Sequence, residues 1–265
     1  METKRTVYGQ FILLGDSHIQ HGGRLSDGFC FGGALTEHVE RRLDVINRGF
    51  SGYNSSNIMA ILEHLFPSIS CAKVDYLLIL LGSNDSRLPE NSANQHVPLE
   101  EYRSNIKGIL TYPLVRSHNP VIFLVTPPPI NEVQLEQFDR DGGNTVLSRH
   151  QSVTAQYAAA IRDLAEEFKD QRVVLVDLWA ALMKEAIALT PDYVEGGGLL
   201  GSRERGDSQG FRRLLTDGLH LTPAGYKVLL DTLLPLMGEG WTGDAAKASW
   251  IFPAWDSEVA PLPRK

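Results

Sequence analysis

Short apolar runs alternate with longer helical patterns along most of the chain, and this alternation restricts the fold more than any other feature of the sequence. The runs are nearly continuous in apolar residues, which is typical of strands covered on both faces. They comprise Phe11–Leu14, Leu43–Ile46, Tyr76–Leu81, Val121–Val125 and Val173–Val176. Because strands separated by helices form parallel βαβ units, we predict an α/β protein. The predicted fold is a three-layer α/β/α sandwich around a five-stranded parallel sheet.

Two of the intervening helices can be predicted from apolar residues that recur three and four positions apart. The first stripe comprises Val153, Tyr157, Ile161, Leu164 and Phe168, and the second comprises Tyr226, Leu229, Leu230, Leu233 and Met237. The second helix is expected to open at Thr222-Pro223, because a hydroxyl N-cap followed by proline at the first helical position is a common helix start.

The chain of 265 residues is long enough for one large domain, which we place at residues 1–238. The remainder, 239–265, carries Trp241, Trp250, Phe252 and Trp255, and this aromatic content is unusual for a disordered end. We therefore expect the tail to pack on the domain or to form a subunit contact, so that a homo-oligomer is one possible assembly.

Charge and cysteine content exclude several classes of protein. A net charge of -7 without a clustered basic face argues against a nucleic-acid or anionic-membrane surface. No stretch approaches the roughly 18 to 20 apolar residues that span a bilayer, and the N-terminus lacks a signal-peptide pattern, so we expect a cytoplasmic protein without membrane insertion. Cys30 and Cys71 cannot form a disulfide framework, although a single bridge stays open.

Three long segments interrupt the alternation: Ser86–Pro98, Pro127–Asn144 and Thr190–Thr216. Loops of this length in a compact domain are either functional or disordered. The first two follow strands and should lie at the C-terminal edge of the sheet, where open α/β folds bind ligands. The glycine-rich third segment is a candidate wall or lid, with a mobile surface loop as an equal alternative.

A serine follows the first strand in the sequence Gly15-Asp16-Ser17, with a helical pattern beginning by about Gly32. A sharp turn from strand to helix would expose the Ser17 hydroxyl at the sheet edge, with backbone N–H groups directed at a developing oxyanion. The simpler interpretation is that Ser17 caps a helix or closes a turn.

Asp217 and His220 lie three residues apart, just before the last predicted helix. A serine hydroxyl is a weak nucleophile and needs a base within hydrogen-bond reach, held in turn by a third group. His220 would be the base, and Asp217 would fix its tautomer. The alternative is a turn-capping aspartate and a packed loop histidine.

Two further features follow neighbouring strands. Asn84, in Gly82-Ser83-Asn84-Asp85, offers a neutral amide donor for an oxyanion, and Gly52 presents a backbone N–H without a side chain. Each alone is compatible with an ordinary turn. Together with Ser17 and His220 they predict one site at the C-terminal edge of the sheet.

The order of these four residues resembles the SGNH/GDSL hydrolases, in which Ser17, Gly52, Asn84 and His220 would occupy the four named blocks. The segments Asp44–Asn54 and Leu215–Leu221 are similar to the isoamyl acetate-hydrolysing esterase branch. The resemblance implies a flavodoxin-like SGNH hydrolase fold for the catalytic domain, a triad of Ser17, Asp217 and His220, and an oxyanion hole of Ser17, Gly52 and Asn84. It further implies short-chain acetate-type esters as substrates and no cofactor.

The substrate pocket is expected to include His18, Asp85, Pro127 and Leu219. His18 and His21 depart from the family pattern after the nucleophile, and they raise the alternatives of a metal site or a second base. Because the His-x-x-His spacing lacks a carboxylate partner in sequence, we expect no metal, and we place His18 in the pocket or under the loop.

The predicted function is serine ester hydrolysis, of the GDSL esterase or lipase type, on a small-molecule ester. Acyl transfer, thioester cleavage and lysophospholipid cleavage on the same site are alternatives. Because a fold does not fix a function, a non-catalytic ester- or carbohydrate-binding module is another.

Overall fold

The computed structural model describes residues 6–25, 29–91, 94–143, 146–191 and 193–256. Its sheet has five strands, all paired in parallel, in the order β2-β1-β3-β4-β5. The strands are β1 (Gly9–Gly15), β2 (Leu43–Gly49), β3 (Val74–Leu80), β4 (Val121–Val125) and β5 (Val173–Val176). The predicted fold class is confirmed.

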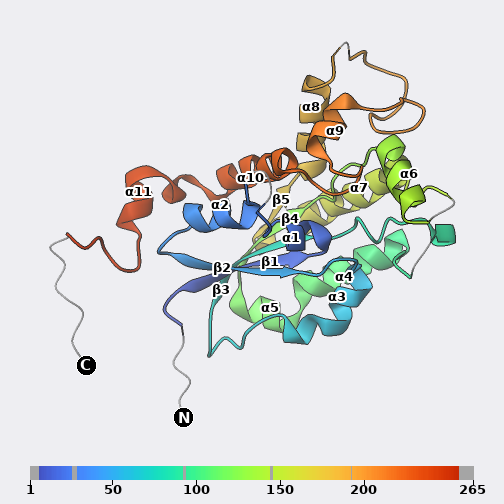
Figure 1. Ribbon diagram of the computed structural model, residues 1–265. Coiled ribbons are helices and arrows are strands. Elements are labelled where there is room, and N and C mark those ends of the chain that lie inside the picture. The colour runs from blue at the N-terminus through green and yellow to red at the C-terminus, as the bar shows by residue number, and fades with distance from the viewer. Residues whose placement is uncertain (1–5, 26–28, 92–93, 144–145, 192, 257–265) are drawn as a thin grey trace.

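Helices cover both faces of this sheet (Figure 1). One face carries α2 (Phe31–His38), α8 (Leu178–Ala188), α9 (Gln209–Leu214) and α10 (Pro223–Met237). The other carries α3 (Ser55–Ile61), α4 (Leu99–Thr111), α5 (Pro113–His118) and α7 (Gln151–Glu167). The remaining helices are α1 (Ser17–His21), α6 (Glu132–Asp141) and α11 (Gly243–Ala248), with 3-10 turns at Leu62–His64, Pro89–Asn91, Lys169–Gln171 and Glu239–Trp241.

Alternate residues of each central strand enter separate hydrophobic cores. In β1, Phe11 and Leu13 pack with the layer of α2 and α10, whereas Ile12 and Leu14 pack with the layer of α3 and α4. Because successive side chains point to opposite faces, a strand covered on both sides must be apolar throughout. This is why the strands read as continuous apolar runs.

The two predicted amphipathic helices form as α7 and α10. Helix α10 begins as expected, with the Thr222 hydroxyl accepting from the Gly225 N–H and with Pro223 at the first position. The helix expected near Gly32 forms as α2, which begins at Phe31, but an additional helix precedes it. This helix, α1, begins directly at Ser17 and is capped by Asp16. A five-residue helix is too short for an apolar period to reveal it.

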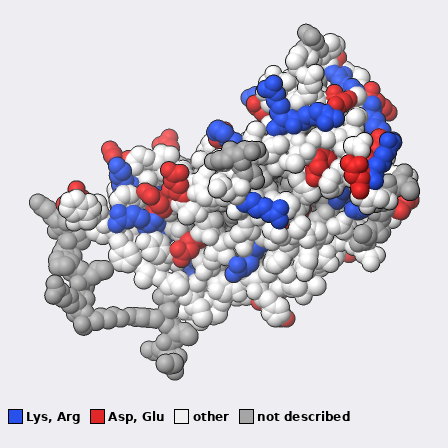
Figure 2. Space-filling view, viewed as in Figure 1, with Lys and Arg blue, Asp and Glu red and all other residues white. Residues whose placement is uncertain are grey.

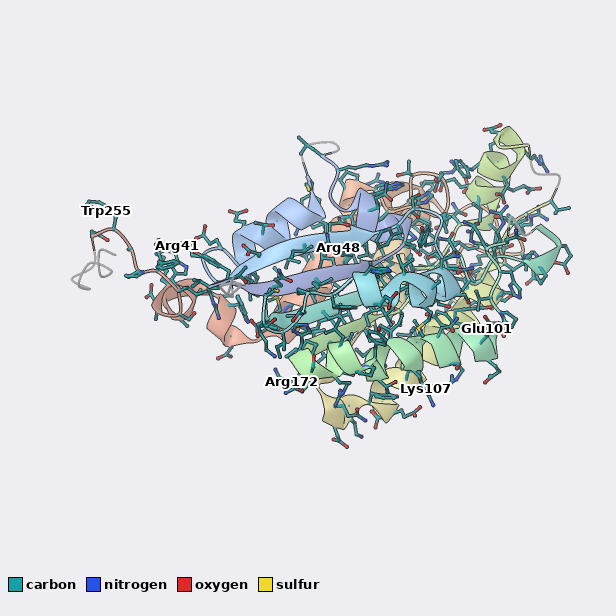
Figure 3. All side chains as sticks on the ribbon, turned by 90° about the horizontal axis from the view of Figure 1, so that it is seen from below. Arg41, Arg48, Glu101, Lys107, Arg172 and Trp255 are labelled. Atoms are coloured by element: carbon teal, nitrogen blue, oxygen red, sulfur yellow. The ribbon has the colours of Figure 1, made fainter. Side chains whose placement is uncertain are left out.

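The described part of the tail packs against the N-terminal ends of the strands. The Arg42 guanidinium lies 3.4 Å from the centre of the Trp241 ring, and Arg41 lies 4.2 Å from that of Trp250. Trp241 is buried, whereas Trp255 is 96% exposed, and Arg41 and Trp255 are seen at the same end of the molecule (Figure 3). Residues 257–265 lie outside the described part, and the domain boundary at 238 stays a prediction.

Within the described ranges, no helix has the length and apolar content needed to cross a bilayer. Cys30 and Cys71 are both free thiols. The Cys30 sulfur accepts from the Gly33 N–H at the start of α2, so it serves as the helix N-cap.

Candidate active site

Ser17 is the first residue of α1, immediately after β1 ends at Gly15. The Asp16 side chain caps this helix by accepting from the His18 N–H at 2.9 Å. At the first helical position the Ser17 N–H has no acceptor within the helix, so it is free for a ligand. The Ser17 residue is only 5% exposed, so it is more buried than the exposed hydroxyl that the sequence predicted.

A chain of two hydrogen bonds joins Ser17 to His220 and Asp217. The Ser17 Oγ lies 3.0 Å from His220 Nε2, and His220 Nδ1 lies 2.6 Å from Asp217 Oδ2. The three side chains predicted to form a triad are therefore within hydrogen-bond distance, although 203 positions separate the serine from the histidine.

A short antiparallel turn holds Asp217 and His220 in place. Leu215 and Leu221 form an isolated bridge, and the Asp217 Oδ1 accepts from the N–H groups of Leu219 and His220 at 3.0 and 2.8 Å. Gly218 has φ +86°, and a Cβ there would lie 2.4 Å from the Leu135 N atom. The turn thus needs glycine both for its backbone conformation and for its close approach to α6.

The charge of Asp217 is well stabilised. Burial alone would raise its pKa, but the hydrogen bond and charge of His220, together with the two backbone N–H groups, lower the pKa to about 2. Asp217 is therefore a carboxylate at neutral pH and accepts the proton on His220 Nδ1. That tautomer leaves Nε2 able to accept a proton from Ser17.

The two other predicted oxyanion donors lie on the loops after β2 and β3. Gly15, Gly49 and Leu80 are in register, so these loops leave the sheet beside Ser17. Gly52 has φ +84°, and its N–H makes no hydrogen bond to a described residue. Asn84 donates one Nδ2 proton to the Tyr53 carbonyl at 2.8 Å, so the second proton is available.

Several buried polar side chains lie close to Ser17 in the sequence or on the neighbouring β3 loop. Asp16, His18 and Asp85 are all 0% exposed. Burial raises the pKa of Asp16 to about 7 and that of Asp85 to about 6, and burial lowers the pKa of His18 well below its usual range. The Asp85 Oδ1 accepts from the Ser55 N–H at 2.9 Å, which ties the β3 loop to α3.

The four predicted pocket residues point into the protein instead of lining an open cavity. His18 and Asp85 have no exposed surface, Leu219 is 5% exposed in a small apolar cluster, and Pro127 is buried near Gly82. The burial of His18 fits the alternative that places it under the loop, and a pocket role for the other three stays a prediction. The position of a residue after a strand locates it at the sheet edge, but the direction of its side chain depends on local backbone geometry.

An open cavity of about 690 Å³ lies beside the His220 ring, on the face that carries α2 and α10. Its size falls in the range of small-molecule sites. Asp217, His220 and the end of the segment 190–216, at Arg212, Leu215 and Thr216, line this cavity. The other lining residues were not predicted from the sequence. They are His21, Arg24, Phe29, Phe31, Leu221, Thr222, Pro223 and Tyr226. The lining includes three aromatic side chains, Phe29, Phe31 and Tyr226, and two arginines, Arg24 and Arg212.

The two histidines that follow Ser17 both pack close to the His220 imidazole. The ring centroids of His18 and His21 lie 5.6 and 5.2 Å from that of His220. His18 is buried, whereas His21 lines the cavity. Among described residues, no group of three or more His, Cys, Asp or Glu side chains could hold a metal ion.

The middle of the glycine-rich segment 190–216 is hydrogen-bonded to the first residue of α6, Glu132. The Gly201 carbonyl accepts from the Glu132 N–H at 2.7 Å, and Glu132 Oε2 accepts from the Arg203 N–H at 3.1 Å. Only the end of the segment, at Arg212 to Thr216, reaches the cavity, and a lid role stays a prediction.

Acidic and basic side chains are mixed on the surface formed by α6, α8 and α9 (Figure 2), as in the Arg203–Glu136 pair.

The chain is similar to known esterases over most of its length. It is 31% identical to the mouse isoamyl acetate-hydrolyzing esterase 1 homolog, covering 94% of this chain and 88% of that protein. It is 32% identical to a GDSL esterase/lipase of Arabidopsis thaliana, covering 88% and 86%. The resemblance to the isoamyl acetate-hydrolysing branch is therefore confirmed.

Solved structures agree on the fold. An acetylxylan esterase from Geobacillus stearothermophilus superposes with a TM-score of 0.58 at 20% identity, covering 92% of this chain and 99% of that one. Another acetyl xylan esterase gives a TM-score of 0.62 at 19% identity, covering 86% and 100%. The GDSL-like lipase/acylhydrolase family matches residues 13–228. The chain belongs to this family, and its predicted class, a carboxylic ester hydrolase, is confirmed.

Proposed function

We propose that the chain cleaves short-chain, acetate-type carboxylic esters through an acyl-enzyme on Ser17. The observation that carries this proposal is the hydrogen-bond chain from Asp217 through His220 to the Ser17 hydroxyl, with distances of 2.6 and 3.0 Å. A buried carboxylate, an imidazole and a hydroxyl in this order form the group that activates serine in acyl transfer.

In the first step, Ser17 Oγ attacks the ester carbonyl carbon while His220 Nε2 takes the hydroxyl proton. The carbonyl oxygen becomes an oxyanion, held by the Ser17 and Gly52 N–H groups and by the Asn84 amide. Collapse of this intermediate breaks the bond to the alcohol oxygen, and His220 returns its proton to that oxygen. Asp217 stabilises the imidazolium throughout.

In the second step, water gives a proton to His220 and its oxygen attacks the acyl carbon. The same donors hold the second oxyanion. When the intermediate collapses, Ser17 Oγ leaves the acyl carbon and recovers the proton from His220. The products are the acid and the free enzyme.

The cavity beside His220 is suited to the alcohol part of the ester. Since His220 must protonate the leaving oxygen, the alcohol has to lie on the side of the imidazole that opens into the cavity. Phe29, Phe31 and Tyr226 give this space an apolar lining. A compact acetyl group on the oxyanion side and a bulkier apolar alcohol in the cavity fit the similarity to isoamyl acetate-hydrolyzing relatives.

Hydrolysis of p-nitrophenyl acetate by wild type and by Ser17→Ala tests the proposal. Wild type should turn over, whereas Ser17→Ala should lose hydrolysis and labelling by a fluorophosphonate while keeping its melting temperature. Ser104→Ala, at an exposed position of α4, is the serine control. Retained turnover in Ser17→Ala would disprove the nucleophile, and an unlabelled wild type would favour a binding module.

Two panels of esters test the substrate assignment. With the alcohol fixed as p-nitrophenol, turnover should fall as the acyl chain lengthens beyond a few carbons. With the acyl group fixed as acetyl, isoamyl acetate should be preferred over ethyl acetate. A preference for long acyl chains would contradict the assignment without affecting the role of Ser17.

A further inference from the structure

Arg149 is buried behind Asn84, two residues before α7 begins at Gln151. Arg149 is only 3% exposed, yet its guanidinium makes three hydrogen bonds. Nε donates to the Ser83 carbonyl at 2.6 Å, Nη1 donates to the Ser148 hydroxyl at 3.1 Å, and Nη2 donates to Asn84 Oδ1 at 3.1 Å. Two of these three acceptors belong to the loop that carries the predicted oxyanion donor.

The guanidinium keeps its charge in this position. Burial, and next the charge of Arg87, lower the pKa of Arg149 to about 10, which still leaves it protonated at neutral pH. Among the described residues, no carboxylate lies within ion-pair distance of it. A buried cation without an ion pair is costly to the fold, so its presence beside the site calls for a functional reason.

The hydrogen bonds of Asn84 define what the cation does. Its Oδ1 accepts from Arg149, and its Nδ2 donates to the Tyr53 carbonyl, so both ends of the amide are held. Rotation of the amide by 180° would place its NH₂ group against the guanidinium and its oxygen against a carbonyl. The cation therefore selects one orientation, and it also withdraws electrons from the amide, which strengthens the remaining N–H donor.

We propose that Arg149 is a positioning residue of the oxyanion hole, which acts through Asn84 Oδ1 to orient and polarise the amide donor for the carbonyl oxygen of the ester. This inference rests on the proposed esterase function. It assigns Arg149 no contact with the substrate. Its effect should therefore be expressed in the transition state, where the oxygen is negative, and little in the binding of the neutral ester.

Steady-state kinetics of Arg149→Met, Arg149→Lys and the control Arg162→Met test the proposal. Arg162 lies on α7 and pairs with Asp177 at 2.8 Å, so its loss removes an arginine that is only partly buried and has no hydrogen bond to Asn84. Arg149→Met should lower kcat by roughly 10- to 100-fold, somewhat less than loss of a donor itself, with KM within about threefold. Arg149→Lys should retain more turnover than Arg149→Met, and Arg162→Met should keep kcat.

A double-mutant cycle with Asn84→Ala separates this role from a purely structural one. If Arg149 acts through the amide, its removal should cost less than about threefold in kcat once Asn84 is already alanine. Binding of a trifluoromethyl ketone, whose hemiketal oxygen occupies the hole, should weaken in Arg149→Met in parallel with kcat/KM. Inhibition by product acetate should change little.

The results distinguish this inference from the proposed function. Wild type without Ser17-dependent hydrolysis would overturn both. An active wild type with a folded Arg149→Met of unchanged kcat, or with losses that add fully to those of Asn84→Ala, would overturn the role of Arg149 alone. Should Arg149→Met fail to fold, Arg149→Lys and its combination with Asn84→Ala complete the same cycle.

Discussion

The Tyr226 hydroxyl donates a hydrogen bond to the main-chain carbonyl of His18 at 2.6 Å. His18 follows Ser17 in α1, and Tyr226 lies in the first turn of α10, which begins three residues after His220. This single bond therefore joins the helix that carries the serine to the helix that follows the histidine. The bond therefore helps to fix the distance between the Ser17 hydroxyl and the His220 imidazole, although neither side chain takes part in it.

Tyr226→Phe removes this bond while keeping the ring. The free energy of unfolding should fall by about 0.5–1.5 kcal/mol, because the His18 carbonyl loses one of two donors and keeps the Gly22 N–H. Since the separation of Ser17 and His220 is then less restricted, kcat should fall a few-fold. Urea denaturation and p-nitrophenyl acetate kinetics measure the two effects. Tyr112→Phe is the control, and an unchanged kcat in Tyr226→Phe would show that the bond stabilises the fold only.

Asp217→Asn replaces the carboxylate that accepts from His220 Nδ1. The amide can present its NH₂ group to the imidazole, which favours the tautomer with the proton on Nε2 and removes the base from Ser17. We expect kcat to fall on the order of 10³- to 10⁴-fold, as for similar triads. Circular dichroism should show an intact fold. A loss below tenfold would mean that Asp217 does not orient His220.

The pH dependence of kcat/KM should have one acid limb. Protonated imidazole cannot accept the Ser17 proton, so activity should decline as the pH falls. The pKa of Asp217 is lowered to about 2, so its carboxylate stays ionised across this limb. The slope of log(kcat/KM) against pH on this limb should therefore be one. A slope of two would show a second essential proton.

Asp16→Asn should stabilise the protein increasingly as the pH rises. Burial raises the pKa of Asp16 from 3.8 to about 7, so the folded protein retains a proton that the unfolded chain has lost. The free energy of unfolding of wild type therefore falls between about pH 4 and pH 7, and asparagine avoids this loss. The gap at pH 8 should be on the order of 2–4 kcal/mol. Melting curves from pH 4.5 to 8 measure it.

The exposed Asp44→Asn on β2 is the control for this series and should track wild type at every pH. A gap between Asp16→Asn and wild type that stays constant with pH would contradict a buried, protonated Asp16. A pH-independent loss of stability would instead show that the carboxylate is needed as the cap of α1.

The five strands of the sheet could be predicted from the sequence, because a strand buried on both faces is a nearly continuous run of apolar residues. Strands β4 and β5 have the predicted bounds, whereas β2 extends past the prediction through Asn47 and Arg48, since an edge strand tolerates polar residues. The pairing of Ser17 with His220 could be predicted because a serine nucleophile needs a histidine base, and that base needs a carboxylate partner.

Side-chain direction and long-range packing could not be predicted in the same way. His18 differs from Ser17 by one position, yet its ring is turned into the protein because the helix starts at once. The cavity combines residues from α1, α2, α9 and α10, and no local pattern links them. Arg149 is a single arginine in a loop, so its contact with Asn84 follows only from the packing that brings the loop before α7 against the loop after β3.

His220 and two of the three predicted oxyanion donors lie on segments next to helices that cover opposite faces of the sheet. His220 lies between α9 and α10, whereas Gly52 precedes α3, and Asn84 bonds to Arg149 just before α7. Mutations in α2, α9 or α10 can thus change the shape of the cavity proposed for the alcohol, while the hydrogen-bond donors proposed for the ester carbonyl stay the same. In such an architecture, relatives can diversify in the alcohols they release and still inherit the same bond-breaking chemistry.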